Sequence, residues 1–217
     1  MDGLSRDQIR SARMVLVMRR QGILDPHILS GFESVDRSAF VGSDFDRLIF
    51  EDCTIPIACG QSIPAPSVIA QLIAALELHT DDIREILVVG AGSGYSCALL
   101  AQYCQHVHGV ERYKTLAEQA AKRLGYLNIA NVSIHHGDGL EGLGLAGPYD
   151  RIVLMGTIST IPAILVDQLS ANGRLTALIQ AADGTQTIRS IRERKIISEI
   201  ALDGAMTPLV KGLAAVL

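Results

Sequence analysis

Residues 86–95 read ILVVGAGSGY, and this stretch decides the fold class of the 217-residue chain. A short apolar run leads directly into glycines at positions 90, 92 and 94. This pattern is typical of a parallel strand that ends in a turn where the backbone approaches a ligand closely. A second apolar run, VHGVER, ends in Glu111 about 20 positions after Gly90, where a nucleoside pocket has the carboxylate that binds two ribose hydroxyls.

The spacing of the glycines separates two classes of nucleotide site. A dinucleotide fingerprint, G-x-G-x-x-G, needs its third glycine at position 95, where this chain has Tyr95. The glycine lies instead at Gly94, so an NAD-dependent oxidoreductase is the least favoured function. The observed G-x-G-x-G spacing is typical of sites for S-adenosylmethionine, which has no pyrophosphate. The alternative is a glycine turn without a ligand.

After residue 84 the pattern alternates between strands and helices. Strands are expected at 85–90, 106–111, 131–136, 150–155 and 173–180, and helices at 94–104, 112–125 and 160–169. Uninterrupted apolar strand cores indicate a parallel sheet covered on both faces, and the alternating residues 185–202 predict an antiparallel hairpin. The fold class is therefore α/β, a three-layer doubly wound, mostly parallel Rossmann-like sheet with an antiparallel C-terminal edge and N-terminal helices.

The N-terminal part is expected to be helical at 5–21, 26–34 and 67–78. Residues 51–66 cannot form a central strand, because Pro56, Pro64 and Pro66 remove donors from the ladder. The length suits a single domain over 1–217. Within it, residues 1–80 would hold the N-terminal helices and a cofactor-covering loop, and residues 81–217 the Rossmann-like core.

Composition excludes several classes of function. The net charge of −4 provides no basic face for nucleic acid. No apolar run approaches the ~20 residues of a membrane span, and the charged start MDGLSRDQIR is not a secretory signal. A soluble, cytoplasmic protein is therefore expected. The cysteines form no CxxC pair and His106 and His108 have no obvious third ligand, so no metal site is expected.

Two carboxylates lie where neighbouring strands would end at the ligand. Glu111 is predicted to accept hydrogen bonds from the ribose; the alternative is a solvated carboxylate paired with Arg112 or Lys114. Asp138, in HHGDG, could accept from the exocyclic amine of adenine, or could form an Asp-Gly turn. The candidate cofactor-binding residues are Gly90, Ala91, Gly92, Gly94, Glu111, Arg112, Asp138 and Gly139.

The segment before the glycine turn, IPIACGQSIPAPSVIAQLIAALEL at 55–78, resembles the protein-L-isoaspartate O-methyltransferase family. The signature of that family is roughly PIG-x-GQTIS-x-P followed by a helix. The resemblance continues through the glycine turn, the VER of Glu111, NVSIHHGDGLEG, GPYDRIVLM and IPAILVDQLSANGRL. It covers about residues 35 to 180, with a weaker similarity in MTPLV near the end.

The resemblance implies methyl transfer from S-adenosylmethionine to the α-carboxylate of isoaspartyl residues in damaged proteins and peptides, the first step of their repair. Such a carboxylate is already an anionic nucleophile near pH 7, so the site needs no general base. The family's loop folds over the cofactor and supplies hydroxyls to the substrate carboxylate. Here the loop contains Gly60, Gln61, Ile63 and Pro64, and Ser62 is the candidate catalytic residue at the family's threonine position.

Three departures from the family pattern remove polar groups. Pro64 stands at the second hydroxyl of the loop, Val88 at a glutamate on the first strand and Met155 at a threonine after the fourth. They favour, as an alternative, a relative with lost or altered specificity that binds the cofactor or methylates another carboxylate. Ser67 could replace the missing hydroxyl, although a helix cap is its expected role. The sequence contains no signal for an oligomeric state.

Overall fold

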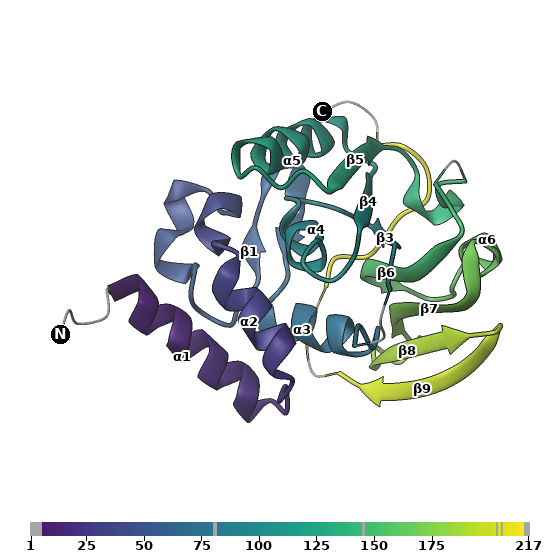
Figure 1. The fold of residues 1–217 in the computed structure, drawn as a ribbon, viewed down its shortest axis with the longest axis horizontal. Helices are drawn as coiled ribbons and strands as arrows, with labels where there is room; N and C mark the ends of the chain where they lie inside the picture. The colour runs from purple at the N-terminus through teal and green to yellow at the C-terminus, as the bar shows by residue number, and fades with distance from the viewer. Residues whose placement is uncertain (1–5, 80–81, 145, 203, 205, 215–217) are drawn as a thin grey trace.

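A seven-stranded sheet organises the chain, in the order β5-β4-β3-β6-β7-β8-β9 (Figure 1). The computed structural model describes residues 6–79, 82–144, 146–202, 204 and 206–214. The parallel strands are β3 (Glu85–Val89), β4 (His106–Glu111), β5 (Val132–His136), β6 (Tyr149–Ile158) and β7 (Leu169–Gln180). The antiparallel strands that extend one edge are β8 (Gln186–Arg192) and β9 (Lys195–Ala201). The predicted fold class and C-terminal hairpin are confirmed.

The strand order reverses beside β3, and this reversal determines where a ligand can bind. Strand β3 pairs in parallel with β4 on one side and with β6 on the other. In a doubly wound sheet the ligand crevice lies outside the carboxyl ends of the strands at such a switch point. The glycine turn follows β3 directly, so it lies at this crevice.

Residues of β3 alternate between two hydrophobic cores. Ile86 and Val88 pack in a core that includes α3 and α4, whereas Leu87 and Val89 belong to a second core that includes α6. Both faces of the strand are buried, which explains its uninterrupted apolar sequence. The helices around the sheet are α3 (Pro66–Ala74), α4 (Tyr95–Leu100), α5 (Lys114–Tyr126) and α6 (Ala163–Asp167).

The N-terminal helices share the first of these cores. Helices α1 (Arg6–Arg20) and α2 (Pro26–Ser34) contact each other and α3 (Figure 1). Short 3₁₀ helices follow at η1 (Arg37–Phe40) and η2 (Ser43–Leu48). The predicted boundary between the N-terminal part and the Rossmann-like core falls at residues 80–81, outside the described residues. No helix in the described ranges is both long and apolar enough to span a membrane.

Two helices end earlier than the sequence predicted. Helix α3 ends at Ala74 rather than at residue 78, because Glu77 adopts a left-handed conformation with φ of +50°. Helix α4 ends at Leu100 rather than at residue 104. There the side-chain amide of Asn131 donates to the carbonyl oxygen of Ala101 at 2.8 Å, which satisfies an acceptor beyond the helix end.

The predicted helix at 160–169 is also shorter in the structure. Helix α6 begins at Ala163, because Pro162 occupies its N-cap position in an extended conformation. Strand β7 then begins at Leu169, which pairs with Tyr149, four residues before the expected start of this strand. Pairing with β6 therefore extends the strand beyond its continuous apolar run.

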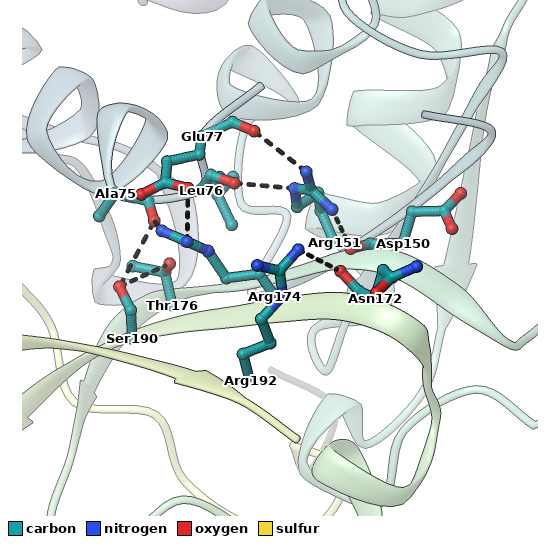
Figure 2. A network of polar contacts seen from close by, with 10 residues as sticks. All are labelled: Ala75, Leu76, Glu77, Asp150, Arg151, Asn172, Arg174, Thr176, Ser190 and Arg192. Atoms are coloured by element: carbon teal, nitrogen blue, oxygen red, sulfur yellow. Dashed lines mark hydrogen bonds and ion pairs between the residues drawn. The ribbon is translucent and has the colours of Figure 1, made fainter. Parts of the chain in front are cut away.

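Two buried arginines close the carbonyl end of α3 (Figure 2). Arg174 donates to the carbonyl of Ala75 at 3.1 Å and to the carboxylate of Glu77 at 2.5 Å. Arg151 donates to the carbonyls of Leu76 at 2.7 Å and Glu77 at 3.0 Å. Residues 75–77 lie directly after the helix, so their carbonyls receive no donors from it, and guanidinium groups from β6 and β7 supply these donors. These hydrogen bonds hold α3 against the sheet.

Replacing Arg174 by Met is expected to lower the free energy of unfolding by about 1–3 kcal/mol, because the carbonyl of Ala75 loses its charged donor. Urea denaturation measures this change. The control is Arg189→Met, which removes a more exposed arginine that pairs with Glu199 on the β8–β9 hairpin and should cost less than about 1 kcal/mol. An equal decrease in the free energy of unfolding in the two variants would show that Arg174 contributes no more to stability than a surface charge.

Candidate active site

A cleft lies at the carboxyl ends of the central strands. Its walls come from residues 61–64, the glycine turn, the end of β4, the end of β6 and the segment after β9. The lining residues are Gln61, Ser62, Pro64, Gly90, Gly92, Glu111, Arg112, Tyr113, Met155, Thr207, Pro208, Leu209 and Val210. The structure therefore brings together seven of the predicted site residues from three distant stretches of sequence.

The predicted glycine turn follows β3, and its three glycines have left-handed backbone conformations. The φ angles are +85° at Gly90, +54° at Gly92 and +89° at Gly94. The N–H groups of Gly90 and Ala91 both donate to the carbonyl of Val110 on β4, at 2.9 and 3.1 Å. The positive φ at position 90 favours glycine, and a Cβ there would also lie 2.9 Å from a methyl carbon of Leu209, whose side chain would have to shift.

Glu111 connects the glycine turn to the end of β4. Its side chain is buried, and one carboxylate oxygen accepts from the N–H of Gly92 at 2.8 Å while the other accepts from the N–H of Tyr113 at 2.9 Å. The alternative of a solvated carboxylate paired with Arg112 or Lys114 is wrong. Each oxygen has two lone pairs, so each keeps acceptor capacity at the cleft wall.

Asp138 forms the Asp-Gly turn that was the alternative for it. One oxygen of its carboxylate caps η4 (Gly139–Glu141) by accepting from the N–H of Leu140 at 3.0 Å, and the other accepts from the N–H of Gly212 at 2.6 Å. Neither Asp138 nor Gly139 lines the cleft, and a Cβ at position 139 would lie 2.7 Å from Val89. Ala91, Gly94, Gly60 and Ile63 likewise shape the surroundings of the cleft without lining it.

Residues 206–214, which we call the strap, cross the carboxyl ends of the parallel strands. The N–H of Thr157, on β6, donates to the carbonyl of Thr207 at 3.1 Å, and the N–H of Leu209 donates to the carbonyl of Thr157 at 2.9 Å. Farther along, the carbonyl of Gly212 accepts from Arg112 at 2.9 Å. The sequence analysis did not identify Thr207 and Leu209 as site residues. Their only signal was the weak similarity of MTPLV, residues 206–210, to the family.

Residues 57–61 form the tight turn of a hairpin between β1 (Ile55–Pro56) and β2 (Ser62–Ile63), and we call residues 57–64 the loop. Cys59 and Gly60 have φ angles of +59° and +63°, and the N–H of Gln61 donates to the carbonyl of Ala58 at 3.2 Å. This is the geometry of a type I′ turn. It places the hydroxyl of Ser62 in the cleft, 3.1 Å from the hydroxyl of Thr207.

Buried Arg37 supports the loop from the protein interior. Its guanidinium donates to the carbonyls of Ile49 at 2.9 Å, Glu51 at 3.0 Å, Cys53 at 3.0 Å and Pro64 at 3.4 Å. Burial lowers the pKa of this guanidinium. Arg37 was not a predicted site residue, and its role is to connect the segment before the loop with the segment after it.

The positions that depart from the family pattern do not all face the cleft. Pro64 and Met155 line it, whereas Val88 is fully buried in the core shared with α3 and α4. The expected helix cap at Ser67 is wrong, because α3 begins at Pro66 and Ser67 lies inside its first turn. The carboxylate of Asp52 accepts from the N–H of Ser67 at 2.8 Å and satisfies the helix start instead.

His108 on β4 and His135 on β5 form a hydrogen-bonded group with Glu85, and this group does not line the cleft. His108 lies 3.0 Å from the carboxylate of Glu85 and 3.2 Å from the ring of His135, and burial lowers the pKa of both histidines. Within the part of the chain that the structure describes, no three metal-ligating side chains are placed to hold an ion. The contacts of this group are those of a structural network.

Comparison with known proteins places this arrangement in a family. The family model described as protein-L-isoaspartate(D-aspartate) O-methyltransferase (PCMT) matches residues 9–213. The chain belongs to the protein-L-isoaspartate O-methyltransferase family. The resemblance in the loop and the glycine turn is thus confirmed over nearly the whole chain.

Relatives in this family match over more than nine tenths of their length. A protein-L-isoaspartate O-methyltransferase from Parvibaculum lavamentivorans is 37% identical, over 93% of this chain and 91% of its own. One from Azorhizobium caulinodans is 36% identical, over 97% of each chain. The structure of a protein-L-isoaspartate O-methyltransferase from Plasmodium falciparum, in complex with S-adenosyl-L-homocysteine, superposes with a TM-score of 0.76 at 25% identity, over 92% of this chain and 98% of its own.

Replacing Cys59 by Asn is expected to raise the free energy of unfolding by about 1 kcal/mol, because asparagine tolerates the left-handed conformation better. Thermal or urea denaturation measures the change. The matched control is Cys53→Asn, because Cys53 is also half-buried but has no positive φ angle. If both variants shift stability equally, the conformation at position 59 is not the cause.

Proposed function

We propose that this chain methylates the α-carboxylate of L-isoaspartyl residues with S-adenosylmethionine as the methyl donor. The observation that supports it best is that the family's loop, the glycine turn and the strap enclose one cleft, with the carboxylate of Glu111 and the hydroxyl of Ser62 in its walls. The proposed partners are isoaspartyl-containing proteins and peptides of the cytoplasm.

The cleft suits the nucleoside part of the cofactor. Glu111 offers one remaining acceptor position on each oxygen, which matches a diol, and the left-handed turn brings backbone close to a ligand. We assign direct contact to Gly90, Gly92, Glu111 and Arg112. Ala91, Gly94, Asp138 and Gly139 would act indirectly, by shaping the turn and holding the strap.

The chemistry depends on placement more than on proton transfer. S-adenosylmethionine supplies a methyl group already activated by its sulfonium. The substrate carboxylate needs no base, so the chain has to orient it and exclude water. Ser62 would donate to the carboxylate, while Met155 and Leu209 provide apolar walls. Orientation of this kind supplies up to ~7–11 kcal/mol in favourable cases.

Incubation with an isoaspartyl peptide and radiolabelled S-adenosylmethionine should transfer label to the peptide. The matched control is the same sequence with a normal aspartyl residue, which should remain unlabelled because its side-chain carboxylate lies on a different backbone geometry. A folded chain that binds S-adenosylhomocysteine but labels neither peptide would contradict the proposal. That result would instead favour a relative with altered specificity.

The Glu111→Ala variant should bind S-adenosylhomocysteine about 1–3 kcal/mol more weakly, because hydrogen bonds to a charged acceptor are lost. Isothermal titration calorimetry measures the affinity. Glu118→Ala is the control, since Glu118 is exposed on α5 and pairs with Lys114 at 3.9 Å. Unchanged affinity in Glu111→Ala would remove Glu111 from the proposed cofactor site.

A further inference from the structure

The hydroxyl groups of Ser62 and Thr207 form a pair in the cleft. They lie 3.1 Å apart, come from segments 145 positions apart in sequence, and either can donate to the other. Each hydroxyl has one proton and two lone pairs, so their mutual hydrogen bond uses only one of two protons. A carboxylate only accepts hydrogen bonds, and both hydroxyls can rotate to donate to it.

Backbone hydrogen bonds hold the segments of both members of this pair before any ligand binds. Ser62 lies on β2, opposite Pro56 of β1, and beside it the N–H of Ile57 donates to the carbonyl of Gln61 at 2.9 Å. The carbonyl of Thr207 accepts from Thr157. A Cβ at position 156 would lie 2.6 Å from that carbonyl oxygen, so Gly156 allows the strap to approach β6. Two donors already held in place cost little to order when a substrate binds.

Pro64 and Met155, which also line the cleft, offer no hydroxyl. Pro64 has neither a hydroxyl nor an N–H, and its carbonyl accepts from Arg37 in the interior. Met155 contributes a thioether, which is a weak acceptor. Among the cleft-lining residues in the described ranges, Ser62 and Thr207 provide the aliphatic hydroxyls.

We propose that Thr207 binds the substrate carboxylate together with Ser62 and performs the role that a second loop hydroxyl would have at position 64. This inference rests on the proposed function, because the carboxylate concerned is that of the isoaspartyl residue. Two donors to one anion form charge-assisted hydrogen bonds that fix its orientation as well as its position. The strap is then part of the substrate site, and the loss of the hydroxyl at position 64 is compensated within this chain.

The test compares Thr207→Val, which keeps the β-branched shape without the hydroxyl, with Thr207→Ser, which keeps the hydroxyl. In label transfer to an isoaspartyl peptide, Thr207→Val should lower kcat/KM about 10- to 100-fold. Thr207→Ser should retain most of the activity. Calorimetry should give the same affinity for S-adenosylhomocysteine in both variants. If Thr207→Val does not fold, Thr207→Ala takes its place in the comparison.

A second variant distinguishes a role of Thr207 in substrate binding from a purely structural hydrogen bond between the loop and the strap. Adding Pro64→Ser to Thr207→Val returns a second hydroxyl to the cleft and should restore turnover. If Thr207 only connected the loop to the strap, this second hydroxyl would not restore turnover. The role of Thr207 is overturned if Thr207→Val remains within about twofold of an active wild type, if Thr207→Ser loses as much, or if Pro64→Ser restores nothing. If the wild type itself labels no isoaspartyl peptide, the proposed function fails and the role of Thr207 fails with it.

Discussion

The arrangement of the molecule depends on the closure of the carbonyl end of α3 by Arg151 and Arg174. These guanidinium groups are almost fully buried, and burying a charge is expensive unless it is fully hydrogen-bonded. The carbonyls of residues 75–77, directly after the helix, provide the acceptors, so this segment and the arginines satisfy each other. Helix α3 begins directly after the 57–64 loop. Fixing its far end to β6 and β7 therefore also fixes where the loop lies over the sheet.

The cleft is assembled from backbone groups more than from side chains. The carboxylate of Glu111 accepts N–H groups from the segments that follow β3 and β4, and Thr157 exchanges two backbone hydrogen bonds with the strap. These contacts connect segments that are distant in sequence. Among the lining side chains are the hydroxyls of Ser62 and Thr207 and the apolar groups of Met155 and Leu209, which suit a reaction in which orientation matters more than proton transfer.

Local signals in the sequence predicted most of the fold. Helix α2 and strand β4 have the expected bounds, because a Pro at the helix start and an apolar run ending in Glu111 are signals within a few residues. The early end of α3 was not predictable, since the arginines that close it come from strands far along the chain. The candidate site shows the same difference. The glycine turn was predictable from its local sequence, whereas the burial of Glu111 and the pairing of Ser62 with Thr207 depend on tertiary contacts.

The strap has a consequence for synthesis of the chain on the ribosome. Strands β3 to β7 can begin to pair as soon as they emerge, because N-terminal segments fold first during translation. The residues that cover the glycine turn emerge only after β8 and β9. A nascent chain therefore presents an open crevice with one wall missing, and the enclosed cleft exists only once Gly212 has left the exit tunnel. The order of elements along the polypeptide thus delays the appearance of the complete site until the sheet that carries it has been made.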